Sequence, residues 1–506
     1  MHHKGKNALI WVDKKTNGLK ERIWRLENPV KTLLGVAMIM LFIFPEHGVA
    51  AQEFIQIPGV IHAHSTFSSG DNTLQSLVSK AKEAGIGVLI PTDHDLVVME
   101  YGLFPLRNLL KKRVEQKSVM KMGPEKYLGA INRINNEQND VLVIPGIQSS
   151  PFYYWTGSPF RGDLTANDYR KELLSIGMMN PQDYLRLPLL HRGFSTNHVK
   201  VFIPRLLIFF ISLVLGIYVS FQKGRIRFFG IGVGFFSLML MINHHPFQSS
   251  KYDPYHGDQG ITPYQELIDY VRKRGGLVFW AHPEARYGEN GVKTGPITLK
   301  TKPYPEALLE SKNYTGFSAL YGDWHHAENP GNQWDQALLD YCQGKRSYPV
   351  WIIAEADFHK DKSDGGVIDF DTYQTIFLSE KKDMKAILDA LSSGKIYTAR
   401  KGDKGRLSID RFQVGSKGSD VYANMGEKLN DPLDTEIHIA ISATDKASHP
   451  IRINVIRGGR ILKRLEGNTP YEIKLEDSDK WTGVNYYRLE VEGFGKVLSN
   501  PIFVNM

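Results

Sequence analysis

The sequence predicts an α/β barrel followed by an all-β domain, with membrane helices at the start and in the middle of the chain. Over residues 52–404, short apolar runs alternate with helical patterns and end in polar, metal-capable residues. This is typical of barrels whose chemistry gathers at the strand ends. Over residues 405–506 the pattern changes to short alternating runs. Uncharged apolar runs also occupy parts of residues 1–51 and 201–242.

Size, charge and cysteine content exclude several classes of protein. The chain has 506 residues, more than one ordinary core holds, so we expect two or more domains. The formal net charge is +8, but basic residues concentrate in residues 1–31, so no nucleic-acid partner is expected. The single cysteine, Cys342, excludes an intrachain disulfide and a cysteine-based zinc module.

Residues 1–51 have the pattern of a signal peptide or signal anchor. An apolar run from Leu33 to Pro45 follows a basic stretch, and Val49 and Ala51 occupy the small-residue positions before a signal-peptidase site. The basic region is longer than usual, so an uncleaved anchor stays open as the alternative. In both cases the chain that follows is exported.

Two uncharged runs, Leu206 to Phe221 and Phe228 to Ile242, predict a transmembrane hairpin within residues 201–242. Each is shorter than the ~20 residues that comfortably span a bilayer, so a pair of buried helices is the alternative. The connector from Gln222 to Arg227 is short and basic, as is typical of a cytoplasmic turn. We therefore expect an inner-membrane protein whose other residues face the periplasm or the exterior.

Residues 55–95 predict a strand–helix–strand unit. An apolar run over residues 55–61 precedes a helical pattern over residues 74–84 and a second apolar run over residues 86–90. Short, fully apolar strands belong to parallel sheets that are covered on both faces. The pattern recurs, with strands predicted over residues 141–147, 277–280 and 350–353 and helices over residues 264–274 and 334–341.

After residue 405, period-2 runs separated by turn signals predict a β-sandwich of about 100 residues. The expected strands are residues 407–412, 436–443, 451–457, 471–475 and 486–491.

Four clusters of metal-capable residues follow the predicted barrel strands. They are His62-Ala63-His64, Asp93-His94-Asp95, Ala281-His282-Pro283 and Asp357-Phe358-His359. Residues two apart in a strand point the same way, so His62 with His64 can direct two ligands to one point, and so can Asp357 with His359. Imidazole and carboxylate together suit Zn, Mn or Fe better than Ca. The sequence therefore predicts a site for two or three such divalent ions.

In this order, the motifs strongly resemble the PHP (polymerase and histidinol phosphatase) family of metal-dependent phosphoesterases. The matching segments are residues 61–65 and 91–95 at its opening motifs, 144–147 at a strand that should end in a metal-bridging glutamate, and 281–283 and 355–359 at its closing motifs. The resemblance covers residues 55 to about 400 and implies a distorted (β/α)7 barrel that the membrane hairpin interrupts. Residues 500–504 resemble the β-domain that ends some larger PHP proteins.

The resemblance implies a trinuclear metal site and hydrolysis of a phosphoester by metal-activated water. The candidate metal ligands are His62, His64, Asp93, His94, Glu172, His282, Asp357 and His359, and His62, His64, His94, Asp357 and His359 are the candidate catalytic residues. For Asp93 a second role stays open, that of orienting a ligand imidazole from behind.

Three positions depart from the family pattern. Ser69 lies where many members have an aspartate ligand, Gln148 replaces the bridging glutamate, and Glu172 stands where a histidine is usual. Glu172 could still bind a metal, whereas Gln148 offers only a neutral amide oxygen. Two functions therefore stay open. One is an envelope phosphoesterase that acts on a small phosphoester or a lipid headgroup. The other is a PHP-derived pseudoenzyme that binds a ligand, or a protein partner through the β-sandwich.

Overall fold

The computed structural model describes residues 54–430, 432, 434–479 and 483–505. The chain divides into two units, residues 1–54 and 55–506. The predicted signal segment, residues 1–51, lies outside the described residues. Everything below concerns the second unit.

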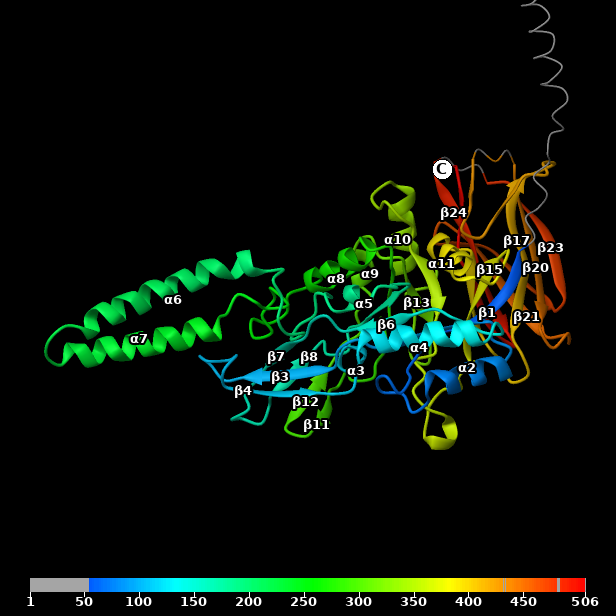
Figure 1. Ribbon diagram of the computed structural model, residues 1–506. Helices are drawn as coiled ribbons and strands as arrows, with labels where there is room; N and C mark the ends of the chain where they lie inside the picture. The colour runs from blue at the N-terminus through cyan, green and yellow to red at the C-terminus, as the bar shows by residue number, and fades with distance from the viewer. Residues whose placement is uncertain (1–53, 431, 433, 480–482, 506) are drawn as a thin grey trace, which may run out of the picture. The chain divides into compact units, whose positions relative to one another are not determined.

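A curled, mixed sheet lies at the centre of residues 55–400 (Figure 1). Its strands follow the order β14-β13-β10-β9-β6-β2-β1-β15-β16. Their bounds are β1 Ile55–Ala63, β2 Val88–His94, β6 Gly146–Ser149, β9 Leu173–Ile176, β10 Leu277–Trp280, β13 Gly316–Leu320, β14 Trp351–Ala354, β15 Tyr373–Ser379 and β16 Ile396–Arg400. Strands β1, β2 and β6 are parallel, as are β10, β13 and β14.

The chain after β14 returns to the end of β1. The Ala356 and Phe358 N–H groups donate to the carbonyls of Ile61 and His62, at 2.9 and 3.0 Å. The sheet is therefore curled enough for the chain that leaves β14 to meet the end of β1 near the metal-capable motifs. The complete (β/α)7 arrangement stays a prediction, since β9 runs antiparallel to β6 and β10.

Helix α2 (Leu74–Glu83) shows how local sequence sets these elements. The Ser76 N–H donates to Thr73 Oγ1 at 3.1 Å, an N-cap that satisfies one of the free donors of the first turn. Leu77 and Ala81 recur at helical spacing and are fully buried. The other helices of the barrel region are α3 Val119–Met122, α4 Pro124–Glu137, α5 Pro181–Tyr184, α8 Thr262–Arg272, α9 Ala307–Glu310, α10 Gln333–Cys342 and α11 Met384–Ser393, and η1 spans Lys362–Asp364.

The strand expected over residues 141–147 is interrupted. It forms β5 (Leu142–Val143) and β6 on either side of Pro145, whose missing N–H cannot continue a ladder. Strand β9, which the sequence did not predict, pairs with β6 so that Leu174 lies opposite Gln148. This pairing brings the segment that carries Glu172 to the strand end that carries Gln148.

Two small sheets lie on one side of the unit, near the first residue of α6 and the last residue of α7 (Figure 1). One is the hairpin of β3 (Val98–Gly102) and β4 (Lys111–Glu115). The other has the order β11-β12-β8-β7, with bounds β7 Tyr154–Thr156, β8 Thr165–Asn167, β11 Val292–Thr294 and β12 Ile297–Lys300.

Helices α6 (Val199–Ser220) and α7 (Ile226–Asn243) lie side by side and extend away from the sheets (Figure 1). Within the described residues, they are the helices long and apolar enough to cross a membrane. They meet through small residues, because a Cβ at Gly216 would lie 2.5 Å from the Gly234 nitrogen. Ser237 Oγ also donates to Ser212 Oγ at 2.8 Å. Such close contacts with large apolar residues on the outside are characteristic of helix pairs in membranes.

The C-terminal strands form two sheets. One has the order β18-β17-β20-β23, and the other continues the central sheet from β16 through β25, β24, β21 and β22. The bounds are β17 Leu407–Ser416, β18 Tyr422–Asn424, β19 Lys428–Leu429, β20 Thr435–Ala443, β21 Pro450–Arg457, β22 Arg460–Asn468, β23 Tyr471–Asp477, β24 Asn485–Gly493, β25 Gly495–Ser499 and β26 Ile502–Val504. The strands expected beyond residue 405 lie within β17, β20, β21, β23 and β24.

Candidate metal centre

The structure brings together the imidazoles of the four predicted clusters. The His62 ring centroid lies 5.2 Å from that of His64 and 5.7 Å from that of His282. The His64 ring lies 4.6 Å from His94 and stacks on His359 at 4.1 Å. Residues that are up to about 300 positions apart in sequence therefore form one histidine cluster at the strand ends, as expected for the C-terminal rim of an α/β barrel.

Asp357 lies at the centre of this cluster. Its Oδ1 lies 3.2 Å from His62 Nε2, 3.5 Å from His64 Nε2 and 3.2 Å from His359 Nε2. Three ring nitrogens thus converge on a single carboxylate oxygen.

The backbone is strained at this point. His62, His282 and Asp357 have φ values of 69°, 27° and 44°. L-residues avoid this region, and each such conformation costs about 1–3 kcal/mol. The register between β1 and β2 also shifts between Ile61 and Ala63. His62 and His64 therefore converge through an irregularity in the strand, and the simple alternation expected from the sequence does not explain it.

Glu355 fixes the tautomer of His62. Its Oε2 lies 3.0 Å from His62 Nδ1 and accepts the Ser318 hydroxyl at 2.5 Å, while its Oε1 accepts the His282 N–H at 3.0 Å. An ionised carboxylate can only accept, so His62 Nδ1 carries the hydrogen. In the neutral ring, His62 Nε2 then has its lone pair directed toward Asp357.

Asp93 fixes the tautomer of His64 through a serine. The Ser68 hydroxyl donates to Asp93 Oδ1 at 2.6 Å, which uses its only hydrogen. Ser68 Oγ, 3.3 Å from His64 Nδ1, must then accept from that nitrogen, leaving a lone pair on His64 Nε2. Asp93 also accepts the Ser65 N–H at 2.8 Å and the Ser65 hydroxyl at 2.6 Å. It is thus engaged behind the imidazoles.

The two lone pairs test whether a cation fits. His62 Nε2 and His64 Nε2 are buried and have no hydrogen-bond partner among the described residues. Both face Asp357 Oδ1, another acceptor, so only a shared proton or metal cation can stabilise this arrangement. Within the described residues, two groups have ligand atoms within 4.8 Å of one another: His62, His282 and Glu355, and His62, His64 and Asp357. The donor set fits a divalent cation of the Zn, Mn or Fe type.

Burial and neighbouring charges shift the pKa values of His62, His94 and Asp357 in different directions. Burial lowers the pKa of His62, but Asp357 and Glu355 outweigh it and raise the pKa to about 9. Burial and the neighbouring His359 lower the pKa of His94 to about 3. Burial opposes ionisation of Asp357, yet the charge of His62 and the nearby rings of His359 and His64 hold its pKa well below its usual range. The centre thus presents an anionic carboxylate with neutral imidazole at His94.

Gln148 and Glu172, two of the departures from the family pattern, contact each other. Gln148 Nε2 donates to Glu172 Oε2 at 2.7 Å, and that oxygen lies 3.4 Å from His282 Nε2. Gln148 Oε1 is buried without a hydrogen-bond partner among the described residues. Burial raises the pKa of Glu172. The pair presents one carboxylate and one free amide oxygen beside the histidine cluster.

Sequence reasoning gave no role to Glu355, Ser65 or Ser68. Glu355 could have been found, because it lies two residues before Asp357, and residues two apart in an extended chain point to the same side. No spacing pattern points to the two serines, since they lie in a loop that folds around Asp93. Ser69 Oγ, at the position of the expected aspartate, lies 3.0 Å from His359 Nδ1.

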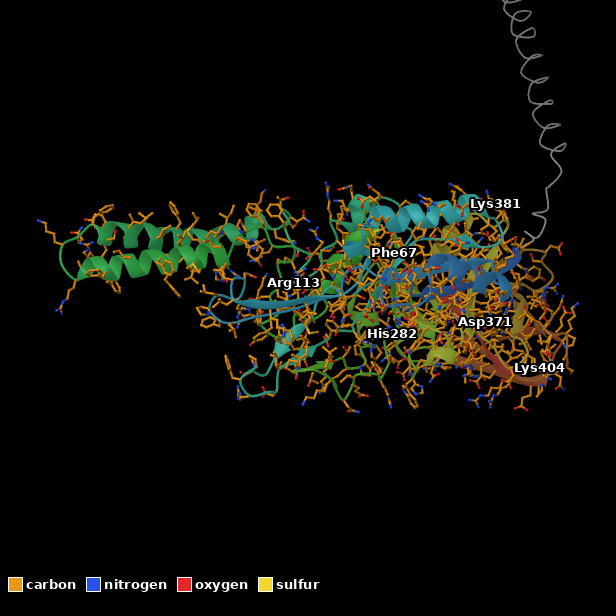
Figure 2. The ribbon with its side chains drawn as sticks, turned by 60° about the horizontal axis from the view of Figure 1, so that its bottom comes forward. Phe67, Arg113, His282, Asp371, Lys381 and Lys404 are labelled. Atoms are coloured by element: carbon orange, nitrogen blue, oxygen red, sulfur yellow. The ribbon has the colours of Figure 1, made fainter. Side chains whose placement is uncertain are left out.

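A cavity of about 1490 Å³ opens onto the cluster. His94, Glu172, His282, Asp357 and His359 line one part of it together with Arg170. Figure 2 places His282 among the strands, and Arg113 lies on the side of the unit that faces α6 and α7. The cavity also reaches residues of the β3–β4 hairpin.

No family model matches the sequence, and no curated protein matches it. Solved structures to which the chain is similar include a two-domain protein from Bacteroides vulgatus that contains a predicted PHP-like metal-dependent phosphoesterase. The identity is 12%, the TM-score is 0.33, and the match covers 86% of this chain and 90% of that one. Another is a candidate metal-dependent phosphoesterase from Bifidobacterium adolescentis, with 14% identity, a TM-score of 0.26 and coverage of 66% and 96%.

A third similar structure is an amidohydrolase from Chromobacterium violaceum with bound sulfate and no metal. The identity is 13%, the TM-score is 0.26, and the match covers 62% of this chain and 90% of that one. At these identities and TM-scores, the function has to be inferred from the side chains of this chain.

Proposed function

We propose that this chain is a metal-dependent phosphoesterase of the PHP type, attached to the cell membrane with its metal centre outside the cytoplasm. The observation that carries the proposal is the convergence of His62 Nε2 and His64 Nε2 on Asp357 Oδ1. Hydrogen bonds at Nδ1 of both rings leave Nε2 to face Asp357, and neither Nε2 has a hydrogen-bond partner among the described residues. The order of the four clusters along the chain supports the PHP type.

Bound divalent ions would supply Lewis-acid polarisation of the phosphoryl group and would increase the acidity of water. We propose two or three ions of the Mn, Zn or Fe type. The residues that would hold them are His62, His64, His94, Glu172, His282, Asp357 and His359. The protein's own contribution is to hold these ligands in one protonation state and orientation, since Glu355 and Asp93 set the tautomers of two rings.

Arg170 supplies a fixed positive charge beside this centre. It lines the same cavity, and its charge acts to lower the pKa values of both Glu172 and His94. A guanidinium in this place favours a phosphate group over a neutral substrate. Arg170 would therefore bind and orient the phosphoryl oxygens.

The test is hydrolysis of para-nitrophenyl phosphate and bis-para-nitrophenyl phosphate by the full chain in detergent with added Mn²⁺ or Zn²⁺. We expect turnover that the double variant His62→Ala/Asp357→Ala lacks. The matched control is Asp253→Ala/His256→Ala, an exposed pair at 2.8 Å that does not line the cavity. Turnover no higher than that of the His62/Asp357 double variant would reject the proposal.

The second candidate is a PHP-derived protein that binds a ligand or a protein partner without hydrolysis. Gln148 favours it, because its amide replaces a bridging carboxylate and partly occupies Glu172. Elemental analysis of protein purified without chelator separates the two: two or three ions per chain support the enzyme, and none or one supports the binder. A Gln148→Glu variant that gains an activity absent from the natural chain would also support the binder.

The proposed membrane topology places the connector between α6 and α7 in the cytoplasm, since residues 222–227 are basic. The single cysteine allows a direct test. In a Cys342→Ser background, a cysteine at Lys223 should resist a membrane-impermeant maleimide in intact cells, and a cysteine at the exposed Asp364 should react. The opposite result would place the metal centre in the cytoplasm.

A further inference from the structure

The cavity at the metal centre has two chemically different ends. One end holds the histidines, carboxylates and Arg170 described above. The other, which we name the apolar arm, is lined by Met99, Tyr101, Leu103, Leu110, Val114 and Trp155. Its volume of about 1490 Å³ exceeds the ~300–1,000 Å³ typical of small-molecule sites. A small phosphoester would leave the apolar arm filled with water against apolar side chains, at a cost in free energy.

The apolar arm belongs mainly to the β3–β4 hairpin, which is attached to the end of helix α7. The Asn108 N–H donates to Asn243 Oδ1, and Asn108 Nδ2 donates to the Asn243 carbonyl, both at 2.7 Å. Asn243 is the last residue of α7. Both views show the hairpin on the same side as α6 and α7 (Figures 1 and 2). The apolar arm therefore opens beside the point where the helix pair leaves the sheets.

The hairpin has the composition of a surface that meets a bilayer. Phe104 and Leu110 at its tip are 81% and 54% exposed, a cost in water that disappears at a membrane interface. Arg107 lies over the Tyr255 ring at 3.8 Å. Lys112 lines the cavity and would attract anionic headgroups, whereas Lys111 beside it is paired with Glu100 at 3.0 Å.

We infer that the substrate is a membrane-resident lipid phosphoester, with its phosphate at the histidine cluster and its hydrocarbon chain in the apolar arm. This inference rests on the proposed phosphoesterase function and names the substrate class of the same site. In the reaction, the oxygen of water forms a bond to phosphorus and the ester P–O bond breaks. The departing oxygen takes a proton, so the lipid alcohol stays in the membrane and the phosphate leaves through the cavity.

The experiment compares esters that share a headgroup and differ in chain length. The full chain in mixed micelles, with the metal that supports para-nitrophenyl phosphate turnover, is given glycerol 3-phosphate and phosphatidic acids with acyl chains of increasing length. We expect kcat/KM to be at least about fourfold higher for the long-chain lipids than for glycerol 3-phosphate, a factor that corresponds to one CH2 group moved from water into the apolar arm. Equal kcat/KM for glycerol 3-phosphate and the long-chain lipid overturns the inference.

A variant pair locates the effect. Leu110→Glu places a charge in the apolar arm and should lower the ratio of long-chain to glycerol 3-phosphate turnover by about tenfold or more. Val421→Glu is the matched control, since Val421 is 66% exposed and does not line the cavity. An unchanged ratio in Leu110→Glu would place the chain elsewhere and overturn the inference.

A binding measurement separates failure of this inference from failure of the proposed function. Trp155 is buried in the apolar arm, so phosphatidic acid brominated on its acyl chains should quench its fluorescence. The signal is the quenching lost on Trp155→Phe substitution, measured in the His62→Ala/Asp357→Ala variant. Quenching without turnover in the natural chain would reject the enzyme and keep the lipid site. Aryl phosphate turnover without quenching would keep the enzyme and reject the lipid site.

Discussion

Two regions of this molecule hold charged groups among buried side chains, and they treat them in opposite ways. Where the C-terminal strands meet α10, Arg488 is fully buried and donates from Nε and Nη2 to the two oxygens of Asp335, both at 2.7 Å. Tyr486 and the Gly331 N–H also donate to Asp335, at 2.7 and 2.8 Å. Here opposite charges face each other, and donors meet acceptors except at Arg488 Nη1, which has no hydrogen-bond partner among the described residues.

At the metal centre, by contrast, ring nitrogens without a hydrogen-bond partner among the described residues face a carboxylate oxygen. His62 Nε2 and His64 Nε2 converge on a carboxylate oxygen, and the backbone adopts positive φ at His62 and Asp357. This region stores free energy that the protein alone does not recover. Buried charge in itself thus says little about function. A cluster of buried side chains whose lone pairs meet no donor indicates a binding site for a ligand. A buried ion pair whose charges are hydrogen-bonded to each other indicates a role in stabilising the fold.

The comparison predicts the largest loss of stability at the satisfied pair. Asp335→Ala leaves the buried Arg488 unpaired and should lower the free energy of unfolding by about 3–5 kcal/mol. Metal affinity of the folded fraction should stay unchanged. Urea unfolding in detergent measures the free energy of unfolding, and calorimetric titration with Mn²⁺ measures the metal affinity.

The control lies on the same helix. Asp340 is 35% exposed and lies 3.4 Å from Lys345, so Asp340→Ala should cost no more than about 1 kcal/mol. Equal losses in the free energy of unfolding for the two variants would mean that the buried pair of Arg488 and Asp335 stabilises the fold no more than an exposed pair does. That result would contradict the comparison between the two regions.

At the metal centre the loss should appear in affinity. Glu355→Gln removes the negative charge and one of the two oxygens that accept from His62, Ser318 and the His282 N–H. Such changes behind a ligand typically lower metal affinity by about 10–100-fold. Titration calorimetry with Mn²⁺ or Zn²⁺ measures this, with the exposed Glu380→Gln as the control. Unchanged affinity in Glu355→Gln would show that Glu355 does not orient a metal ligand.

The sequence anticipated which segments carry the site better than it anticipated how they converge. The capped helix α2 and the apolar strands β1, β10 and β14 follow from local patterns. The antiparallel strand β9 does not, because the direction of Leu173–Ile176 depends on pairing with β6 and β10. Strand β4, which is mostly charged, is a strand only because β3 pairs with it.

The same limit applies to the site. The two-residue spacing groups Glu355 with Asp357 and His359 on one side of an extended chain. Nothing in that spacing reveals that His62 has a φ of 69°. That conformation follows from hydrogen bonds between residues 61–64 and the chain after β14, which are remote in sequence. The residue types were therefore predictable and the tautomers were not.

Another buried carboxylate, Glu100 in β3, extends the comparison and has the smallest expected effect. Burial opposes its ionisation, but His191 and Lys111 outweigh burial and lower the pKa of Glu100 from 4.5 to about 2. Lys111 Nζ lies 3.0 Å from its Oε2, so it resembles the satisfied pair. A depressed pKa stabilises the fold above the unfolded-state value, and this stabilisation disappears as the pH falls from about 4.5 to about 2.

Glu100→Gln should therefore lower the free energy of unfolding at pH 7 by about 1–3 kcal/mol, and its difference from the natural chain should shrink below pH 4.5. Urea unfolding between pH 7 and pH 3 measures it, with the exposed Glu125→Gln as the control. A difference that stays constant down to pH 3 would mean that Glu100 is not held as an anion. The β3–β4 hairpin would then be held to α7 by the hydrogen bonds between Asn108 and Asn243, and Glu100 would not belong with Asp335 among the carboxylates that neighbouring donors keep ionised.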